Sequence, residues 1–452
     1  DKQFRSALSS ETIGKDSSGN AGNITLKTRN LSIRDGALIS TETFNQGRGG
    51  NLTVTAAESL QVSGAPSFPE GGFWRSALST LTQGTGKAGN LEIIDTGLIK
   101  IEEGAGVFAS SIGQGKGGNI NIAADFLELR GSSTDGEFSS FLGSETTGIN
   151  SRADAGDITI AAGNINIFDG AFISTQTLNQ GKGGNLTVTA RESLNIFGTA
   201  AINGNTSISG LFTSTSGLGA AGNIKIFDTN RIVMNSGGQV SASSSGFGQG
   251  GNIEINADTV DLIGFSSNNQ IVSAFASETF GKDSIANAGD IKVTSRVLNI
   301  RDGARISTQT FNQGRGGNLA INARESLDIV GTGIQNEQVV GSGLFTITAS
   351  FGAAGNIKIF DTELLTIKDG GQIVASTFGQ GQGGNIEVSA GNVEILGISS
   401  NGQFTSAVGS ETAGANSSAD AGDVTLTARN LNIRDRGLIS TRSFNQGKAG
   451  NI

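Results

Sequence analysis

The sequence contains no cysteine, no histidine and no tyrosine among its 452 residues. Without cysteine the chain can form neither a disulfide nor a thiolate metal site. The absence of histidine removes the commonest general base of enzymes, and the usual nucleophile pairs are missing as well. Any catalysis would therefore depend on carboxylates assisted by Arg or Lys.

Positive charge is also scarce, and long hydrophobic runs are absent. The 31 Lys and Arg residues are outnumbered by 40 Asp and Glu, which gives a formal net charge of −9. Because the basic residues are spread singly, we expect no nucleic-acid partner and no binding to an anionic membrane surface. No apolar run approaches the roughly 20 residues of a membrane helix. The chain opens without Met or a signal-peptide pattern, so we expect either a processed protein or a piece of a longer one.

Glycine, in contrast, is abundant: it accounts for 70 residues, whereas proline occurs twice. Collagen's three-residue period is missing, so this much glycine indicates many tight turns. A Gly-Asn or Gly-Asp pair recurs along the chain, each time followed by an aliphatic residue. The Asn or Asp of the pair stands at Asn23, Asn51, Asn90, Asn119, Asp157, Asn185, Asn223, Asn252, Asp290, Asn318, Asn356, Asn385, Asp423 and Asn451. The chain is therefore a repeat protein.

The spacing of these pairs alternates between short units of 28–29 residues and long units of 38–39 residues. Similarity is strongest at about 133 residues, or four units, as residues 155–198 and 288–331 illustrate. We place superrepeats at 23–156, 157–289 and 290–422, with partial ones at 1–22 and 423–452. Length alone would suggest about three globular domains, but stacked repeats form one body. We therefore predict a single continuous β-solenoid over 1–452.

Inside one unit, hydrophobicity alternates with a period of two. Ile24 and Leu26, then Leu31 and Ile33, are apolar with polar residues between them, and residues 37–42 alternate in the same way. Such runs, bounded by Gly, Asn and Asp, are typical of strands with one buried face. We predict an all-β parallel β-helix of about 13–14 coils with three strands per coil. At a spacing of about 4.8 Å, thirteen coil intervals would span about 60 Å.

Two columns of stacked residues are expected from the repeat. The residues that follow the Asn or Asp, beginning with Ile24, should form an aliphatic ladder in the core. Thr41 should point inward, whereas Arg305, which replaces the equivalent of Leu38, should lie on the outer face. A second column stands seven residues before the Asn, and we expect it to fill the core near a corner. Its members are Phe44, Ile112, Leu178, Phe311, Phe378 and Phe444.

The long units carry about ten extra residues after the second predicted strand. These insertions begin near Gly64, Gly131, Gly198, Gly264, Gly331 and Gly397. Because they occupy the same point of the coil, they should emerge along one edge, where repeat proteins often bind partners. The first insertion holds both prolines and the only tryptophan. Its Phe68, Phe73 and Trp74 could stack on a sugar ring or pack the loop onto the coils.

The Gly-Asn pair has a structural explanation. Glycine supplies a positive φ at a corner, and Asn or Asp tolerates turn conformations and can form hydrogen-bonded ladders along the axis. A calcium site is the alternative, but Asp157, Asp290 and Asp423 lie four coils apart and cannot share an ion. The GxGxxG matches at 113–118 and 379–384 precede strands rather than helices, so they indicate turns. We expect no metal and no cofactor.

Two further functions find little support in the sequence. Parallel β-helices host enzymes that cleave acidic polysaccharides, and the candidate acids here are Glu102, Glu103, Asp361 and Glu363. These residues belong to different coils, so we predict that the chain is not an enzyme and has no catalytic residues. Ice-binding solenoids need an exposed Thr pair on every coil. The pairs Thr41 and Thr43, Thr175 and Thr177, and Thr308 and Thr310 recur only once per superrepeat.

The repeated segments carry a family resemblance. The patterns AGNI-x-L/I, GA-x-IST-x-T-F-x-QG-x-GGN-L/I-x-V and SLNI-FG resemble the repeat region of large filamentous-haemagglutinin-like exoproteins, particularly those of cyanobacteria, along the whole chain. This resemblance implies a right-handed parallel β-helix, export through an outer-membrane transporter by two-partner secretion, and adhesion or matrix roles. It contributes no catalytic residues. The family's N-terminal secretion domain is not recognisable, so the export route is implied only.

Together these observations predict a non-enzymatic structural or adhesive fibre segment at the cell surface. The insertion edge would contact cell-surface or matrix glycans or other cells. Residues 1–4 align with 401–404 inside a long unit, and the chain stops at the opening of another, which would allow end-to-end association. A polysaccharide-binding or polysaccharide-degrading β-helix is the alternative function, and an ice-binding solenoid comes third.

Overall fold

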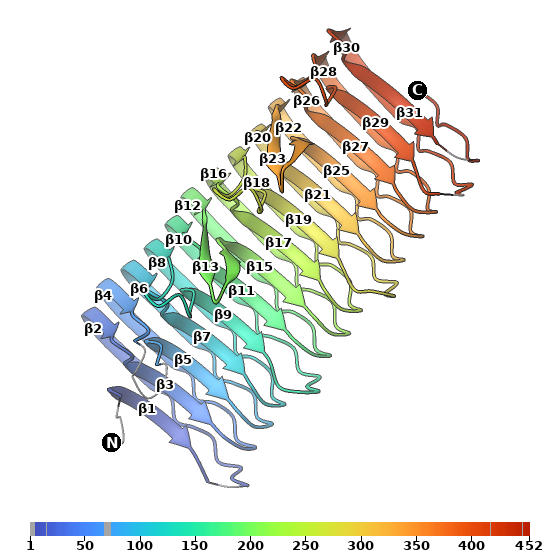
Figure 1. The fold of residues 1–452 in the computed structure, drawn as a ribbon. Coiled ribbons are helices and arrows are strands. Elements are labelled where there is room, and N and C mark those ends of the chain that lie inside the picture. The colour runs from blue at the N-terminus through green and yellow to red at the C-terminus, as the bar shows by residue number, and fades with distance from the viewer. Residues whose placement is uncertain (1–4, 15, 67–73, 416, 445) are drawn as a thin grey trace. The chain divides into compact units, whose positions relative to one another are not determined.

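The computed structural model describes all residues except 1–4, 15, 67–73, 416 and 445 (Figure 1). The described residues form 31 strands and no helix, and accordingly no helix among them could cross a membrane. Contacts divide the chain into a first unit, residues 1–224, and a second unit, residues 225–452. Within each unit successive coils stack through parallel strand pairs, so the predicted parallel β-helix is confirmed.

Each coil consists of one long strand and one short strand. The long strands of the first unit are β2 (Ile24–Arg34), β4 (Leu52–Ser63), β6 (Leu91–Glu102), β8 (Ile120–Arg130), β10 (Ile158–Phe168) and β12 (Leu186–Phe197). Its short strands are β1 (Ala7–Thr12), β3 (Leu38–Thr43), β5 (Ala77–Thr82), β7 (Gly106–Ser111), β9 (Phe141–Thr146), β11 (Phe172–Thr177) and β15 (Gly210–Thr215). Each set forms its own parallel sheet in chain order.

The second unit repeats this plan, apart from β16 (Ile224–Asn235), which begins at the unit boundary. The other long strands are β18 (Ile253–Ile263), β20 (Ile291–Arg301), β22 (Leu319–Val330), β26 (Ile357–Lys368), β28 (Ile386–Leu396) and β30 (Val424–Arg434). The short strands are β17 (Gln239–Ser244), β19 (Ala274–Thr279), β21 (Arg305–Thr310), β25 (Gly343–Thr348), β27 (Gln372–Thr377), β29 (Ala407–Thr412) and β31 (Leu438–Ser443).

The coil contains two strands, not the three that we predicted. Residues 24–34, interpreted from the sequence as two strands, form the single strand β2. Its pairing with β4 shifts between Thr28 and Asn30, where one strand carries an extra residue. Such a bulge exchanges the inward and outward positions without ending the strand. The change in parity from Ile24 and Leu26 to Leu31 and Ile33 therefore lies within one continuous strand.

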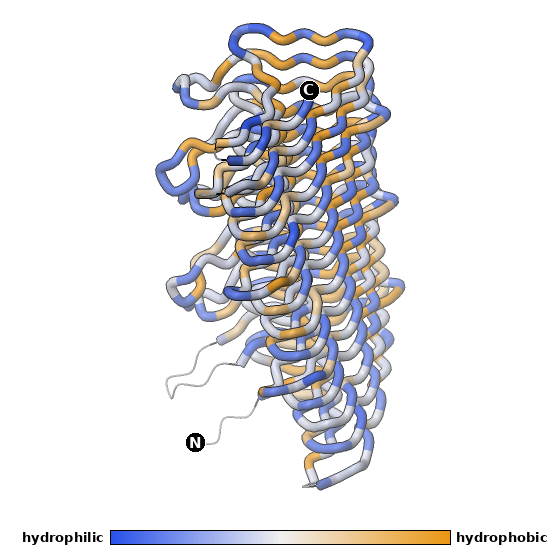
Figure 2. Tube along the Cα trace, turned by 90° about the vertical axis from the view of Figure 1, so that its right-hand side faces the viewer, coloured by the Kyte–Doolittle hydropathy of each residue, from blue (hydrophilic) through white to orange (hydrophobic). Residues whose placement is uncertain are grey.

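The interior is filled by like residues stacked on like residues, as Figure 2 shows by the alternation of hydrophobic and hydrophilic positions along the strands. The column that begins at Ile24 is buried from Leu52 to Val424, with Leu52, Ile158 and Ile291 fully inaccessible, whereas its last member, Ile452, is exposed. Ile306 is also fully buried whereas Arg305 stays on the outer face, as predicted. Between adjacent coils these side chains cover one another, which a single coil could not achieve.

Inward-pointing threonines close the coil at its corner. Thr41 is fully buried, as predicted, and its hydroxyl donates to the carbonyl of Gly50. Thr80, Thr213 and Thr346 make the same bond to the corner glycines of their own coils, at 2.5–2.6 Å. All six threonines of the three pairs considered for ice binding are buried: Thr41, Thr43, Thr175, Thr177, Thr308 and Thr310. They therefore cannot form an exposed ice-binding array.

The second predicted column is not in the core. Ile112, Leu178, Phe311, Phe378 and Phe444 are 43–59% exposed, and Phe44 is half-buried. The reason is the period of the short strand, where residues equivalent to 39, 41 and 43 point inward. The next residue must then point outward. The prediction that this column fills the core was wrong.

Candidate functional site

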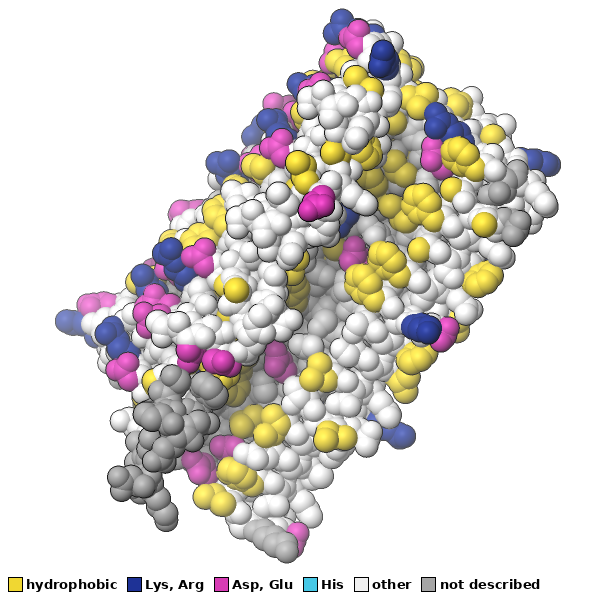
Figure 3. Space-filling view, in the orientation of Figure 1, with side chains coloured by type: hydrophobic (Ala, Val, Ile, Leu, Met, Phe, Trp, Pro, Cys, Tyr) yellow, Lys and Arg dark blue, Asp and Glu magenta, His cyan; other side chains and the backbone are white. Residues whose placement is uncertain are grey.

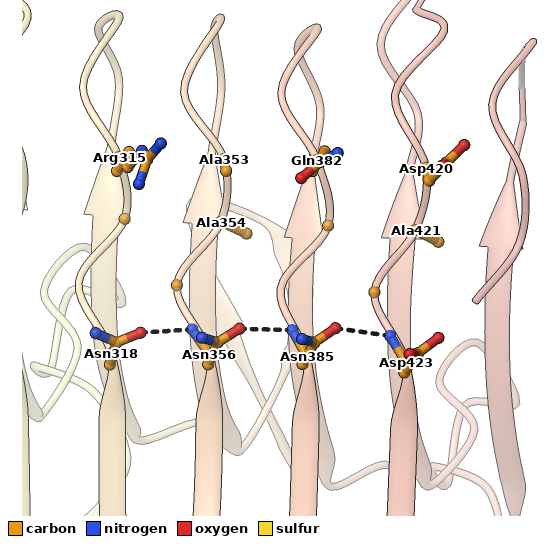
Figure 4. A pocket seen from close by; sticks show the side chains of 14 residues that line it. Arg315, Asn318, Ala353, Ala354, Asn356, Gln382, Asn385, Asp420, Ala421 and Asp423 are labelled. Atoms are coloured by element: carbon orange, nitrogen blue, oxygen red, sulfur yellow. Dashed lines mark hydrogen bonds between the residues drawn. The ribbon is translucent and has the colours of Figure 1, made fainter. Parts of the chain in front are cut away.

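The Gly-Asn corner forms a hydrogen-bond ladder within each unit. The side-chain oxygen of each Asn or Asp accepts from the backbone N–H of its equivalent in the next coil, as in Asn318 to Asn356 at 2.9 Å and Asn356 to Asn385 at 2.8 Å (Figure 4). These hydrogen bonds therefore join a side-chain oxygen to a backbone N–H, and not one side-chain amide to the next. After an Asp the amide of the next Asn also donates, as Asn318 does to Asp290. The ladder borders a shallow polar hollow of about 470 Å³ in the second unit.

The three Asp positions of the corner belong to this ladder. In the second unit, Asp290 accepts from the backbone and the amide of Asn318, and Asp423 does the same with Asn451. Asp157 bonds Asn185 in the same way in the first unit. Among the described residues no group of three or more Asp or Glu side chains is placed to hold a metal ion. The corner thus links neighbouring coils.

The insertions begin where the long strands end, as predicted. Each opens with a glycine at positive φ, such as Gly64 and Gly331. Two form antiparallel hairpins, β13 (Thr199–Ile202) with β14 (Asn205–Ile208) and β23 (Thr332–Gln335) with β24 (Gln338–Gly341) (Figure 1). Neighbouring insertions also meet: the backbone N–H of Asn336 donates to the carbonyl of Asn269 at 3.0 Å. They therefore form a wall rather than separate loops.

A buried serine anchors every insertion, and sequence reasoning missed it. These are Ser76, Ser140, Ser209, Ser273, Ser342 and Ser406, all buried. Each hydroxyl accepts from a glycine N–H in the turn of a neighbouring coil, for example Gly303 to Ser342 at 2.8 Å. Ser342 also donates to the carbonyl of Val330 at 2.7 Å. The signal was present, because a serine precedes the short strand in each long unit.

A groove follows the outer face of the short-strand sheet. Figure 3 shows the surface hollowed between the insertions and the corner turns, with hydrophobic side chains inside it. In the second unit this groove contains a cleft of about 400 Å³. Its lining includes Phe345, Ile347, Val374 and Leu438 from the short strands, Gln403 and Phe404 from an insertion, Phe378 from the corner, and Gln372, Glu411 and Arg442. The lining is about equally polar and apolar, and a cleft of this size with both kinds of group can hold a ligand.

In the first unit the same face carries a row of phenylalanines. Phe108, Phe141, Phe172 and Phe212 lie on β7, β9, β11 and β15, with successive ring centroids 5.5, 5.9 and 6.3 Å apart. The guanidinium of Arg75, from the first insertion, lies 4.5 Å from the ring centre of Phe141. Because Phe108 and Phe141 stack face to face, they cover each other's faces and leave edges toward the groove.

One glutamate per superrepeat projects from the groove floor. Glu145, Glu278 and Glu411 each follow a serine in a Ser-Glu-Thr triplet. Burial raises the pKa of Glu145, against the opposing effects of a 3.1 Å hydrogen bond from Ser174 and of the charge of Arg75. Burial also lowers the pKa of Arg75 to about 10, so it stays protonated at neutral pH. Glu145 and Arg75 thus interact electrostatically inside the groove.

The second unit repeats this arrangement with different partners. Burial raises the pKa of Glu278, opposed by the charge of Arg305 and by Ser307. Glu411 lies 3.5 Å from the guanidinium of Arg442 on the neighbouring strand. Glu278 and Glu411 are four coils apart, which is about 19 Å at the strand spacing. Glycosidase carboxyl pairs are about 5–9.5 Å apart, so these two cannot act together on one bond.

The raised pKa of Glu278 predicts a specific pH dependence. A carboxyl that titrates higher when folded contributes stability below its unfolded pKa of about 4.3 and loses it as the pH rises through the folded value. We expect wild type to lose more unfolding free energy than Glu278→Gln between about pH 4.5 and about pH 7.5, measured by denaturant titration. Ile334→Ala, which changes an exposed side chain without a titratable group, should keep the wild-type pH dependence. A Glu278→Gln variant with the wild-type slope would contradict this prediction.

The predicted catalytic candidates do not form one site. Glu102 and Glu103 lie at the end of β6 in the first unit, where the amide of Gln61 donates to Glu102 at 2.5 Å. Asp361 and Glu363 lie in the middle of β26 in the second unit and line a shallow hollow of about 270 Å³. There Glu363 is 56% exposed and pairs with Arg429. The exposure of Glu363 and its ion pair with Arg429 are typical of a charge pair on the protein surface.

The aromatic cluster of the first insertion is only partly described. Phe68 and Phe73 lie outside the described residues. Trp74 is half-buried, and its backbone N–H donates to the carbonyl of Pro66 at 3.4 Å. This bond joins the two ends of the insertion's described part.

No protein-family model matches this chain, and neither a curated protein nor a solved structure matches it. The corner ladder, the insertion wall and the groove are therefore the features from which a function can be inferred.

Proposed function

We propose that this chain is a non-enzymatic structural and adhesive segment of an extracellular fibre. The coils serve as the scaffold, and the groove beside the insertions serves as the contact surface for cell-surface or matrix glycans. Secretion through an outer-membrane transporter is part of the proposal, in keeping with the family resemblance. A chain without cysteine has no disulfide to form before or after export, and its coils can stack one after another.

The observation that carries this proposal is that the corner and the core of the coil stay constant while the insertions vary. The corner keeps Gly-Asn or Gly-Asp and the core keeps aliphatic residues in every unit, whereas the insertions that wall the groove differ in sequence and conformation. Phe404 and Gln403 of one insertion line the cleft of the second unit together with Leu438 and Arg442. A lining with both polar and apolar groups suits a sugar, which has both apolar faces and hydroxyls.

The test is direct binding of the full chain to an array of polysaccharides, with analysis of the released products. We expect retention of at least one glycan without chain cleavage. Phe404→Ala should weaken that binding about tenfold, which corresponds to about 1.4 kcal/mol. Ile334→Ala, at an exposed site on hairpin β23, should bind as wild type. If Phe404→Ala bound the glycan as tightly as wild type, the groove would not be the contact surface.

A polysaccharide-degrading enzyme is the second candidate, and one observation favours it. Glu11 and Glu42 are register partners on β1 and β3, on neighbouring strands about 4.8 Å apart. Burial raises the pKa of Glu42, and the charge of Glu11 adds to this effect, while Gln83 and Arg5 oppose it. A carboxyl with a raised pKa beside a second carboxylate is the arrangement of acid–base catalysis. Release of oligosaccharides by wild type, abolished in Glu42→Gln, would establish this function instead.

A further inference from the structure

The corner of the second unit exposes a row of phenylalanines to solvent. Phe247, Phe280, Phe311, Phe351, Phe378 and Phe444 are each 47–60% exposed. We call these six residues the phenylalanine row. They follow the short strands β17, β19, β21, β25, β27 and β31, and among the short strands of this unit only β29 is not followed by one, because Ala413 and Ala415 stand there.

The row persists although the corner sequence varies. Phe280, Phe311, Phe378 and Phe444 stand directly after their strands. Where Ser245 or Ala349 takes that position, a phenylalanine appears two residues later, as Phe247 or Phe351. The rings of Phe280 and Phe311 stack with centroids 5.1 Å apart and an angle of 11° between their planes. Phe280 and Phe311 thus join neighbouring coils in one apolar strip, which is interrupted at β29 before Phe444.

The exposed area of the phenylalanine row is at the lower limit of a specific interface. A phenylalanine buries about 150–250 Å², so six half-exposed rings offer about 600 Å². The largest apolar patch of a typical monomer is about 300–600 Å², and a standard interface buries about 800 Å² on each partner. Two such strips would bury about 1,200 Å² in total, which is the lower end of specific interfaces, so we expect a dimer of modest affinity.

The geometry points to a second copy of this chain as the partner. The rings follow the coil spacing of about 4.8 Å, and a partner must match that spacing to contact every ring. A second copy has the same coil spacing. A two-fold axis would place its phenylalanine row against the row of the first copy. The corner segments of this unit carry both signs of charge: Lys282, Arg315 and Lys448 against Asp283, Asp290, Asp420 and Asp423. We propose that two copies pair side by side through the phenylalanine row.

Sedimentation velocity of the full chain tests the pairing. Wild type should form a dimer in the micromolar range, and the triple variant Phe280→Ser, Phe311→Ser, Phe351→Ser should weaken dimerisation at least tenfold. These positions avoid Phe378, which also lines the cleft. Ile334→Ser, equally exposed but on hairpin β23, is the control and should dimerise as wild type. Circular dichroism should show that all variants keep the wild-type β-sheet content.

Because the chain has no native cysteine, a single introduced thiol gives a second readout. Under mild oxidation, Phe311→Cys should form a disulfide-linked dimer faster than Ile334→Cys. A wild type that stays monomeric in the micromolar range would overturn the pairing, as would equal crosslinking at both positions. Binding of monomeric wild type to neutral phosphatidylcholine vesicles, lost in the triple variant, would assign the row to a lipid surface instead. Phe404→Ala should leave pairing intact, so this inference can fail independently of glycan binding.

Discussion

Replacing Gly355 by alanine should disrupt the stacking of the second unit. A Cβ atom at this position would lie 1.8 Å from the carbonyl oxygen of Gly317 in the preceding coil. That oxygen belongs to the backbone of the corner and accepts a hydrogen bond from Thr308, so it cannot move without breaking contacts. We expect a loss of about 3 kcal/mol or more in the free energy of unfolding. Chemical denaturation followed by circular dichroism measures the loss.

Gly14→Ala is the matched control for this substitution. A Cβ atom on Gly14 would meet its nearest neighbour, the Cβ of Ser17, at 3.6 Å, which is an ordinary contact. We therefore expect a change within about 0.5 kcal/mol. If Gly355→Ala and Gly14→Ala had similar small effects, the close approach of successive corners would not exist in solution.

Replacing Phe275 by alanine should have the second large effect. Phe275 is fully buried on β19, in register with Val240 on β17 and Ile306 on β21. Truncation would leave a cavity between coils that cannot move closer, because the backbone hydrogen bonds fix their spacing. We expect a loss of about 3–5 kcal/mol in the free energy of unfolding. Guanidinium titration measures it.

Phe311→Ala is the control for the loss of unfolding free energy expected from Phe275→Ala. Phe311 is 50% exposed, so its truncation should cost far less than that of Phe275 when both are measured on monomeric protein at low concentration. Equal costs for the two substitutions would contradict the assignment of Phe275 to the core and of Phe311 to the surface.

Several features of the fold could be predicted because they depend on local chemistry. The Gly-Asn spacing gave the coil lengths. The positive φ predicted at the glycine of the pair was wrong, because the described glycines with positive φ lie elsewhere, for example at the start of the insertions. The pair needs glycine because a Cβ atom there would collide with the backbone of the preceding coil, as at Gly355. Alternation in residues 37–42 placed Thr41 inside the coil. The strand count was wrong because a change of parity near Thr28 was interpreted as a strand end, whereas the pairing continues through a bulge. Hydrophobicity alone could not place Phe311, because an interior and an interface both favour phenylalanine.

The candidate site was less predictable than the fold. The glutamates of the Ser-Glu-Thr triplets recur with the superrepeat and could have been found from the sequence. Their cationic partners could not, because Arg75 comes from an insertion while Arg305 and Arg442 come from neighbouring strands. Phe404 reaches the cleft only through the conformation of its insertion, where Ser399 accepts from its backbone N–H at 2.9 Å. The path of an insertion depends on contacts between coils, which repeat spacing does not encode.

The central claim is that this chain works outside the cell as part of a surface fibre. Immunogold electron microscopy of intact, unpermeabilised cells that make the protein tests this claim most directly. The account predicts gold particles on the outer surface, aligned along unbranched fibres. Labelling that appears only after permeabilisation, or that lies over the cell interior, would contradict it.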